Sequence, residues 1–185
     1  ILDAARNLFI EKGFHQTGMA QVSSMSGVAP FQIYRYFASK EALIAMICEQ
    51  EVLRWLDHIQ LRHAIARNDP AAVRHWISRF GGITDTSHSV ETARMMSEII
   101  AELGRNPRLS QKYQRLDTCI RENLSKAIRF ITSDVASDEK ILRATNRIME
   151  IGFASLCVNI TRFNLVNESQ SYAETLIDNE IDAMN

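Results

Sequence analysis

Residues 19–37 read Met-Ala-Gln-Val-Ser-Ser-Met-Ser-Gly-Val-Ala-Pro-Phe-Gln-Ile-Tyr-Arg-Tyr-Phe, and this stretch decides the fold. A helix-turn-helix needs a small residue where its two helices cross, a glycine four residues later for the tight turn, and apolar residues that pack the pair together. Ser23 is the small residue and Gly27 is the glycine. The predicted packing positions are Val22, Val28, Ile33 and Tyr36. The spacing favours a helix-turn-helix, although a plain helical hairpin shows the same pattern in some proteins.

The composition around this motif predicts an almost wholly helical protein. Glycine and proline are scarce, with 7 and 3 copies in 185 residues, whereas a sheet with many tight turns needs more of them. Apolar residues make up 46% of the chain, which excludes disorder as the main state. The sequence has no uninterrupted apolar run long enough for a membrane span, so no membrane partner is expected.

Helix boundaries follow from the few breakers and from apolar residues at helical spacing. Asp69-Pro70 and Asn106-Pro107 are typical of helix starts, because an N-cap residue precedes proline at the first helical position. We expect about nine helices, three short ones and then six longer ones. They lie near residues 1–12, 18–25, 29–36, 39–63, 70–80, 88–103, 107–131, 137–164 and 170–183. A domain border is expected inside the fourth helix, which divides the chain into residues 1–45 and 46–185.

The residues around the motif resemble those of the TetR family of transcriptional repressors. The matching positions are Thr17, Met19-Ala20, Gly27-Val28, Ile33-Tyr34-Arg35-Tyr36-Phe37 and Ser39-Lys40-Glu41-Ala42-Leu43. The resemblance covers about the first 45 residues, and the other 140 agree with the family only in length and helicity. It implies an all-α, TetR-like fold with an N-terminal three-helix helix-turn-helix domain. It also implies a C-terminal helical domain that binds an effector and forms a homodimer.

Several residues of this segment are predicted to contact double-stranded DNA. Pro30 starts the recognition helix, from which Phe31, Gln32 and Arg35 are expected to point into a major groove. Gln32 suits an adenine edge, and Arg35 suits guanine or a phosphate. Phe31 has two alternatives, packing on thymine methyl groups or on its own helix.

Phosphate contacts are expected from four further side chains. The family resemblance assigns this role to Tyr34 and Tyr36, although Tyr36 equally suits the core. Lys40 lies in the first turn of a helix, where a lysine and free N–H groups bind phosphate, unless it is simply solvated. Thr17 is expected to play the same part at the preceding helix.

The charge of this segment is low for a DNA-binding domain. Residues 1–45 hold four basic side chains and three acidic ones, a net charge of +1, and the whole chain has a net charge of −1. The segment Ala29-Pro30-Phe31 stands where the family commonly has Ser-Lys-Gly, so one phosphate-binding lysine is absent. Strong non-specific binding needs many phosphate contacts. Because the chain starts at Ile1 already in helical phase, we expect preceding residues to supply the rest.

Two C-terminal helices are expected to form a dimer interface. Residues 148–160 carry a single charge and are apolar on nearly every face, and such a helix must be covered all round. Gly152, Ala154 and Ser155 would allow close helix approach. With the single apolar stripe of the last helix, the helices near 137–164 and 170–183 form half of a predicted four-helix interface between two copies. The alternative is a monomer core.

An effector cavity is implied by the family resemblance. Bulky side chains of the kind that line apolar pockets are the candidates, although each also suits plain core. The bulky candidates are Trp55, Trp76, Phe80, Met95, Met96, Tyr113 and Phe153, and the acid Glu150 is added to them. Glu150 has three alternatives, which are a cationic ligand, a partner across the dimer, and water.

Catalytic, cofactor and metal motifs are absent from the sequence, so no enzyme activity, cofactor or metal is expected. The three cysteines form no C-x-x-C pair, and their odd number favours reduced thiols in the cytoplasm. We therefore expect a transcription regulator, most simply a repressor that an effector releases from a palindromic operator. The alternatives are a TetR-like DNA binder with a structural or division-related role and no inducer, and an enzyme with an incidental helix-turn-helix.

Overall fold

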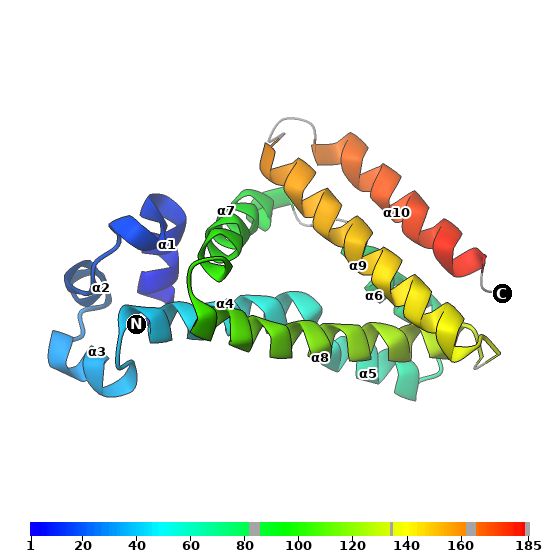
Figure 1. Ribbon diagram of the computed structural model, residues 1–185, viewed down its shortest axis with the longest axis horizontal. Helices are drawn as coiled ribbons and strands as arrows, with labels where there is room; N and C mark the ends of the chain where they lie inside the picture. The colour runs from blue at the N-terminus through cyan, green and yellow to red at the C-terminus, as the bar shows by residue number, and fades with distance from the viewer. Residues whose placement is uncertain (82–85, 134, 162–165, 184–185) are drawn as a thin grey trace. The chain divides into compact units, whose positions relative to one another are not determined.

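The protein is all-α in its computed structural model, which describes residues 1–81, 86–133, 135–161 and 166–183 (Figure 1). Within these ranges every regular element is a helix. The elements are α1 (Leu2–Gln16), α2 (Met19–Ser26), α3 (Pro30–Tyr36), α4 (Lys40–Leu56), α5 (His58–Ala66), α6 (Pro70–Ser78), η1 (Arg79–Gly81), α7 (Thr86–Leu103), α8 (Pro107–Ile131), α9 (Asp138–Thr161) and α10 (Val166–Asp182). The predicted fold class is confirmed. In the described part of the chain, no helix is long and apolar enough to cross a membrane.

The helix starts predicted at Asp69 and Asn106 are confirmed. The Asp69 carboxylate accepts a hydrogen bond from the N–H of Ala72 at 3.0 Å, and Pro70 opens α6. The Asn106 side chain accepts from the N–H of Leu109 at 3.1 Å at the start of α8. Both side chains satisfy N–H groups that a helix start leaves without partners.

The helix predicted over residues 39–63 is divided into α4 and α5. Asp57 between them has φ 43° and ψ 50°, and its carboxylate accepts from the N–H of Gln60 at 3.3 Å, which starts a new helix. The buried indole N–H of Trp76 donates to the C=O of Leu56 at 2.7 Å and satisfies the carbonyl at the end of α4. The end of α4 is therefore also bound by a residue 20 positions away.

The described chain forms two compact units. The first contains residues 1–55 and 94–116, and the second contains residues 56–93 and 117–185. One apolar core joins α1–α4 to the second part of α7, because Met95 and Ile99 are fully buried together with Phe9, Ile33 and Leu43. The functional border predicted near residue 45 stays a prediction.

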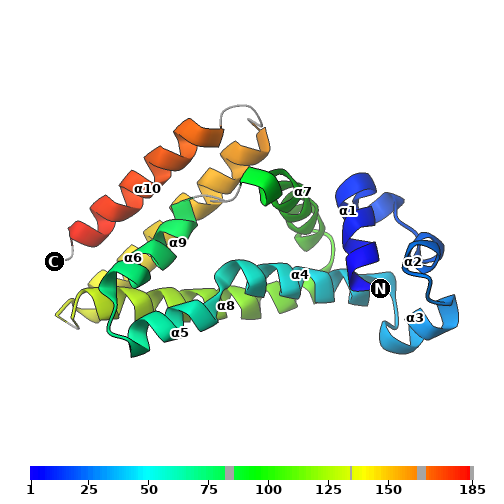
Figure 2. The ribbon, with the colours of Figure 1, turned by 180° about the vertical axis from the view of Figure 1, so that it is seen from behind.

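Helices α9 and α10 run side by side in the second unit (Figure 2). Arg147 and Glu180 form an ion pair between them at 2.9 Å. The last helix begins at Val166, four residues before the predicted start. Two of the small residues predicted to allow a close dimer contact make close contacts within their own chain. A Cβ atom added to Gly152 would lie 2.8 Å from the C=O of Phe80, and Ser155 donates to the C=O of Gly81 at 2.7 Å.

Candidate nucleic-acid interface

The turn of the helix-turn-helix is built as its sequence predicts. Gly27 ends α2 in the left-handed conformation, with φ 68° and ψ 10°, which glycine adopts without steric cost. The Ser23 hydroxyl donates to the C=O of Val28 at 2.8 Å and ties α2 to the turn. Pro30 then opens α3, and Ile33 and Val22 pack the pair with side chains exposed by 0% and 1%. This packing fixes which face of α3 is turned outward.

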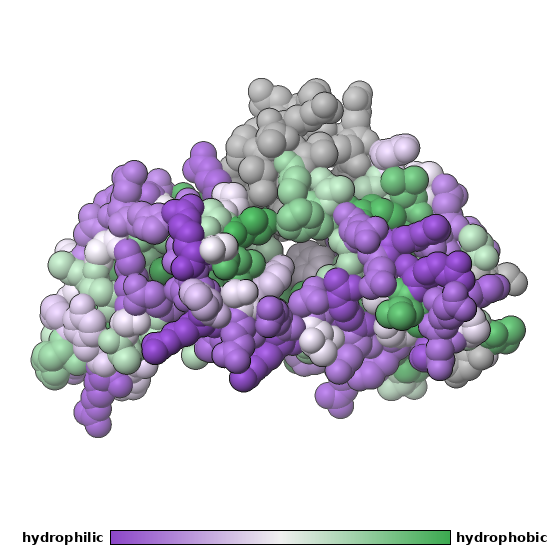
Figure 3. Space-filling model, in the orientation of Figure 1, coloured by the Kyte–Doolittle hydropathy of each residue, from purple (hydrophilic) through white to green (hydrophobic). Residues whose placement is uncertain are grey.

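The outward face of α3 carries the side chains predicted to read DNA. Gln32 and Arg35 are exposed, as are Phe31 and Tyr34 with exposed fractions of 73% and 50%. Figure 3 shows apolar side chains at the outer edge over α3, next to hydrophilic ones. Within the described ranges, none of these four side chains forms a hydrogen bond or an ion pair. They are therefore available to a ligand that approaches α3.

Tyr36 was expected at a packing position, and that expectation is wrong. Its side chain is 72% exposed, and Phe37 packs against the core instead. Tyr36 is the last residue of the short helix α3, so its side chain points outward where the helix ends. Its alternative assignment, a phosphate contact, stays a prediction.

Thr17 and Lys40 are engaged inside the protein. The Thr17 side chain is 1% exposed, and its hydroxyl donates to the C=O groups of Gly13 and Leu8 at 2.9 and 3.2 Å. The Lys40 ammonium donates to the C=O groups of Phe14 and Thr17 at 2.8 and 3.3 Å. Their phosphate contacts stay predictions. To contact a phosphate, the Lys40 ammonium must keep only part of its hydrogen bonds to these two C=O groups or break them.

The start of α4 carries a negative charge beside Lys40. The Ser39 hydroxyl accepts from the N–H of Ala42 at 3.3 Å, as expected of a cap. A hydrogen bond from the Ser39 side chain, followed by the backbone N–H of Glu41, lowers the pKa of the Glu41 carboxyl. Glu41 therefore stays ionised at neutral pH and weakens the attraction of this helix start for phosphate.

The candidate effector residues are divided between the two units. Trp55, Met95, Met96 and Tyr113 belong to the first, where Met95 is fully buried in the core and Met96 and Tyr113 pack against it. The other four, Trp76, Phe80, Glu150 and Phe153, belong to the second. The predicted set therefore does not form one site within either unit.

Within the second unit the four candidates also differ. Trp76 and Phe80 are buried and stack edge to face, with ring centroids 5.4 Å apart. Glu150 and Phe153 lie at the surface, and the Phe153 side chain is 54% exposed. In the part of the chain that is described, no cluster of three His, Cys, Asp or Glu side chains is suited to a metal ion.

A contact that the sequence analysis missed joins α1 to α7. The N–H of Phe14 donates to Glu98 Oε2 at 2.7 Å. A signal for it was present, because Glu98 shares a helix face with the buried residues Met95 and Ile99 at i, i+3 and i+4. An acid on an apolar face needs a partner.

Comparison with known proteins points to one family. Residues 1–47 match the family model of bacterial regulatory proteins, tetR family. The HTH-type transcriptional regulator UidR of Escherichia coli (strain K12) is 31% identical over 132 residues, which are 70% of this chain and 63% of UidR. The chain therefore matches less than two thirds of this relative's length.

Solved structures share the fold over nearly the whole chain. A TetR transcription regulator from Haloarcula marismortui has a TM-score of 0.81 at 17% identity, covering 99% of this chain and 95% of that one. A transcriptional regulator from Saccharomonospora viridis in complex with choline has a TM-score of 0.72 at 15% identity, covering 96% and 93%. At these identities the likeness shows the fold alone. UidR is named as a transcriptional regulator and not as an enzyme, in agreement with the sequence-based expectation.

Proposed function

We propose, on the premise that the chain belongs to the tetR family of bacterial regulatory proteins, that it acts in the cytoplasm as a homodimeric repressor. Two copies of α3 bind a palindromic operator in adjacent major grooves, about 34–36 Å apart. A small-molecule effector releases the protein from this operator. Family membership is the reason to expect DNA binding. The dimer, the symmetry of the operator and the response to an effector are proposed in addition.

The observation that carries DNA binding is the outward face of α3. Phe31, Gln32, Tyr34 and Arg35 are exposed on a helix that Ile33 holds against the core. Gln32 offers an amide that pairs with adenine N6 and N7, and Arg35 offers a guanidinium for guanine or phosphate. Tyr36 and Lys40 are the proposed phosphate contacts beside them.

Base readout is tested by selecting bound duplexes from a random pool and measuring affinities by fluorescence anisotropy. Gln32→Ala should weaken the selected operator by about 5–150-fold, because one bidentate base contact is worth about 1–3 kcal/mol. Its affinity for random DNA should change far less. Tyr36→Phe, which removes the exposed hydroxyl of a proposed phosphate contact, is the control, and it should weaken both kinds of DNA about equally. Equal losses on operator and random DNA for Gln32→Ala would contradict the assigned role.

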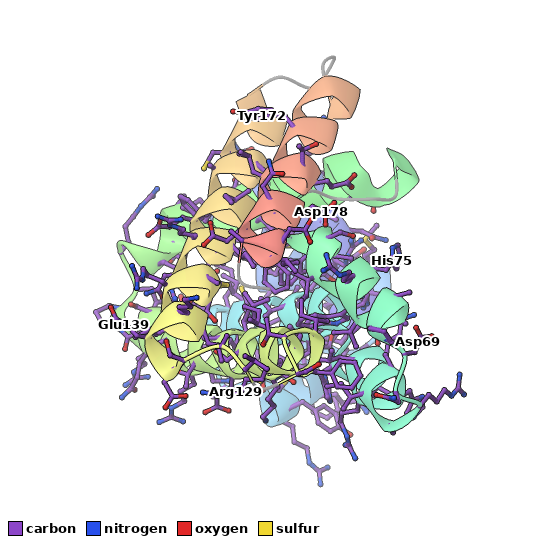
Figure 4. The ribbon with its side chains drawn as sticks, turned by 90° about the vertical axis from the view of Figure 1, so that its right-hand side faces the viewer. Asp69, His75, Arg129, Glu139, Tyr172 and Asp178 are labelled. Carbon is purple, nitrogen blue, oxygen red and sulfur yellow. The ribbon has the colours of Figure 1, made fainter. Side chains whose placement is uncertain are left out.

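The dimer is proposed to form through α9 and α10. Leu142 and Phe153 on α9 and Tyr172 on α10 have exposed fractions of 60%, 54% and 68%. Figure 4 looks onto this helix pair and labels Tyr172. Exposed apolar side chains on neighbouring helices are typical of a surface that a second subunit covers.

A charge placed on this surface tests the dimer. Ala154 is exposed on α9 beside Phe153, so Ala154→Glu should produce monomers in light scattering, because an unpaired charge in an interface is costly. Ala66→Glu, at an exposed position in α5, is the matched control and should leave the mass unchanged. An unchanged mass for Ala154→Glu would remove α9 from the interface.

The effector is proposed to bind in the second unit, at the core around Trp76 and Phe80. The similar fold from Saccharomonospora viridis holds choline, which supports the capacity of such a fold for a small molecule. A coupling of about 1–3 kcal/mol between the sites would weaken operator binding by about 5–150-fold. A metabolite panel added to the operator complex tests this. Release by one compound supports the repressor, and no release by any compound favours a structural or division-related DNA binder.

A further inference from the structure

The corner between α1 and α2 is held by charged side chains from two other helices. Glu98 of α7 accepts a hydrogen bond from the N–H of Phe14 at 2.7 Å. Lys40 of α4 donates to the C=O of the same residue at 2.8 Å. Both backbone polar groups of Phe14 are thus bound by ionised groups, and such hydrogen bonds are about twice as strong as neutral ones.

The geometry of Gly13 makes room for the Glu98 carboxylate. Gly13 has φ 80° and ψ 167°, which interrupts α1 and leaves the next N–H without a helical acceptor. A Cβ atom at this position would lie 3.0 and 3.1 Å from the two carboxylate oxygens of Glu98. The carboxylate therefore occupies the space that a side chain at residue 13 would fill.

The rest of the corner is closely packed and hydrogen-bonded. The buried ring of Phe14 packs edge to face on Phe9, with centroids 4.9 Å apart. The Thr17 hydroxyl donates to the C=O of Gly13 at 2.9 Å. On either side of Glu98, Met95 and Ile99 are buried in the same core as α1 and α3. A displacement of Phe14 would thus be passed on to the helices that follow it.

We propose that Glu98 is a positioning residue for operator binding. By holding Phe14, its carboxylate sets the orientation of α1–α3 on the end of α7, and with it the direction in which α3 faces DNA. Glu98 itself contacts no DNA. The DNA-binding body is therefore larger than residues 1–47 and includes residues 94–116. This inference rests on the proposed function.

The test uses the full chain and operators whose half-site spacing is changed by about one or two base pairs, since spacing reports the orientation of the two recognition helices. Glu98→Ala should lose about tenfold or more on the best spacing, because a charge-assisted bond in the first unit's core is lost. It should also discriminate less between spacings, while its affinity for random DNA stays within about twofold.

Two conservative variants separate positioning from folding. Glu98→Gln keeps an oxygen that accepts from Phe14, so it should bind the operator within about threefold of the wild type. Glu98→Asp keeps the charge with a shorter reach, and it should show a loss of about threefold or more with a broader spacing preference. If Glu98→Ala does not fold, Glu98→Asp serves as the test variant. Glu122→Ala, which removes an exposed charge on α8, is the control and should bind like the wild type.

Wild-type affinity and spacing preference in folded Glu98→Ala and Glu98→Asp would overturn the inference while leaving the proposed function intact. Equal defects in Glu98→Gln and Glu98→Ala would also overturn it, because the accepting oxygen would then be irrelevant. A wild-type chain that selects no DNA from the pool would instead overturn the proposed function, and this inference with it.

Discussion

The helix-turn-helix and the α9–η1 contact both depend on a glycine, but for different physical reasons. Gly27 is needed for its own conformation, with φ 68°, and a Cβ atom there would meet nothing within 4 Å. Gly152 is helical, and a Cβ atom there would lie 2.8 Å from the backbone C=O of Phe80. One glycine satisfies a local turn, and the other permits a long-range approach. Only the first kind can be identified from the neighbouring residues.

The largest effect is expected at Gly152. Gly152→Ala forces α9 away from η1, because the obstructing atom is backbone, and overpacking of this kind costs about 1–3 kcal/mol. Urea unfolding monitored by circular dichroism should show the loss. A change in the free energy of unfolding below about 0.5 kcal/mol would mean that the backbone at Phe80 shifts easily to make room for the methyl group.

A smaller effect is expected at Gly27. Gly27→Ala should cost about 1 kcal/mol, because alanine is strained at positive φ although space is available. Gly104→Ala is the matched control, since Gly104 does not have a positive φ and no atom lies within 4 Å of its added Cβ. Thermal melts of the two variants should differ by several degrees. Equal melting temperatures would show that the turn tolerates a side chain.

The smallest effect on stability is expected at Cys48, and it appears only at high pH. Burial raises the pKa of its thiol to about 12, from an ordinary value of about 9.0. Above pH 9 the unfolded chain gains stability by ionising this thiol while the folded chain does not, so the free energy of unfolding should fall as pH rises toward 12. Cys48→Ala should reduce this fall. The same fall in wild type and variant would assign it to other groups.

Thiol labelling checks the same burial at neutral pH. A maleimide should react with the half-buried Cys119 of α8 before Cys48, which is 2% exposed. Cys48 should become reactive only on unfolding, because the thiolate is the reacting form. Early labelling of Cys48 would show that the core of the first unit opens readily.

Long-range contacts explain what the sequence analysis missed. At the break between α4 and α5, the Trp76 indole binds the C=O of Leu56, 20 residues away. Lys40 binds carbonyls 23 and 26 residues away. Met95 and Tyr113 suited a ligand pocket by residue type, yet they pack in the first unit with α1–α4. Residue type predicts that a side chain is buried, but not which helices bury it.

The sequence by itself determined the all-α class, the helix-turn-helix, the outward face of α3 and the caps at Asp69 and Asn106. Each of these depends on interactions within about five residues, which a linear pattern records. Only the tertiary structure decided that Thr17 and Lys40 bind carbonyl groups, that Gly152 lies against Phe80, and that Glu98 holds Phe14. These contacts join residues from 9 to 84 positions apart, and their partners are chosen by the packing of whole helices.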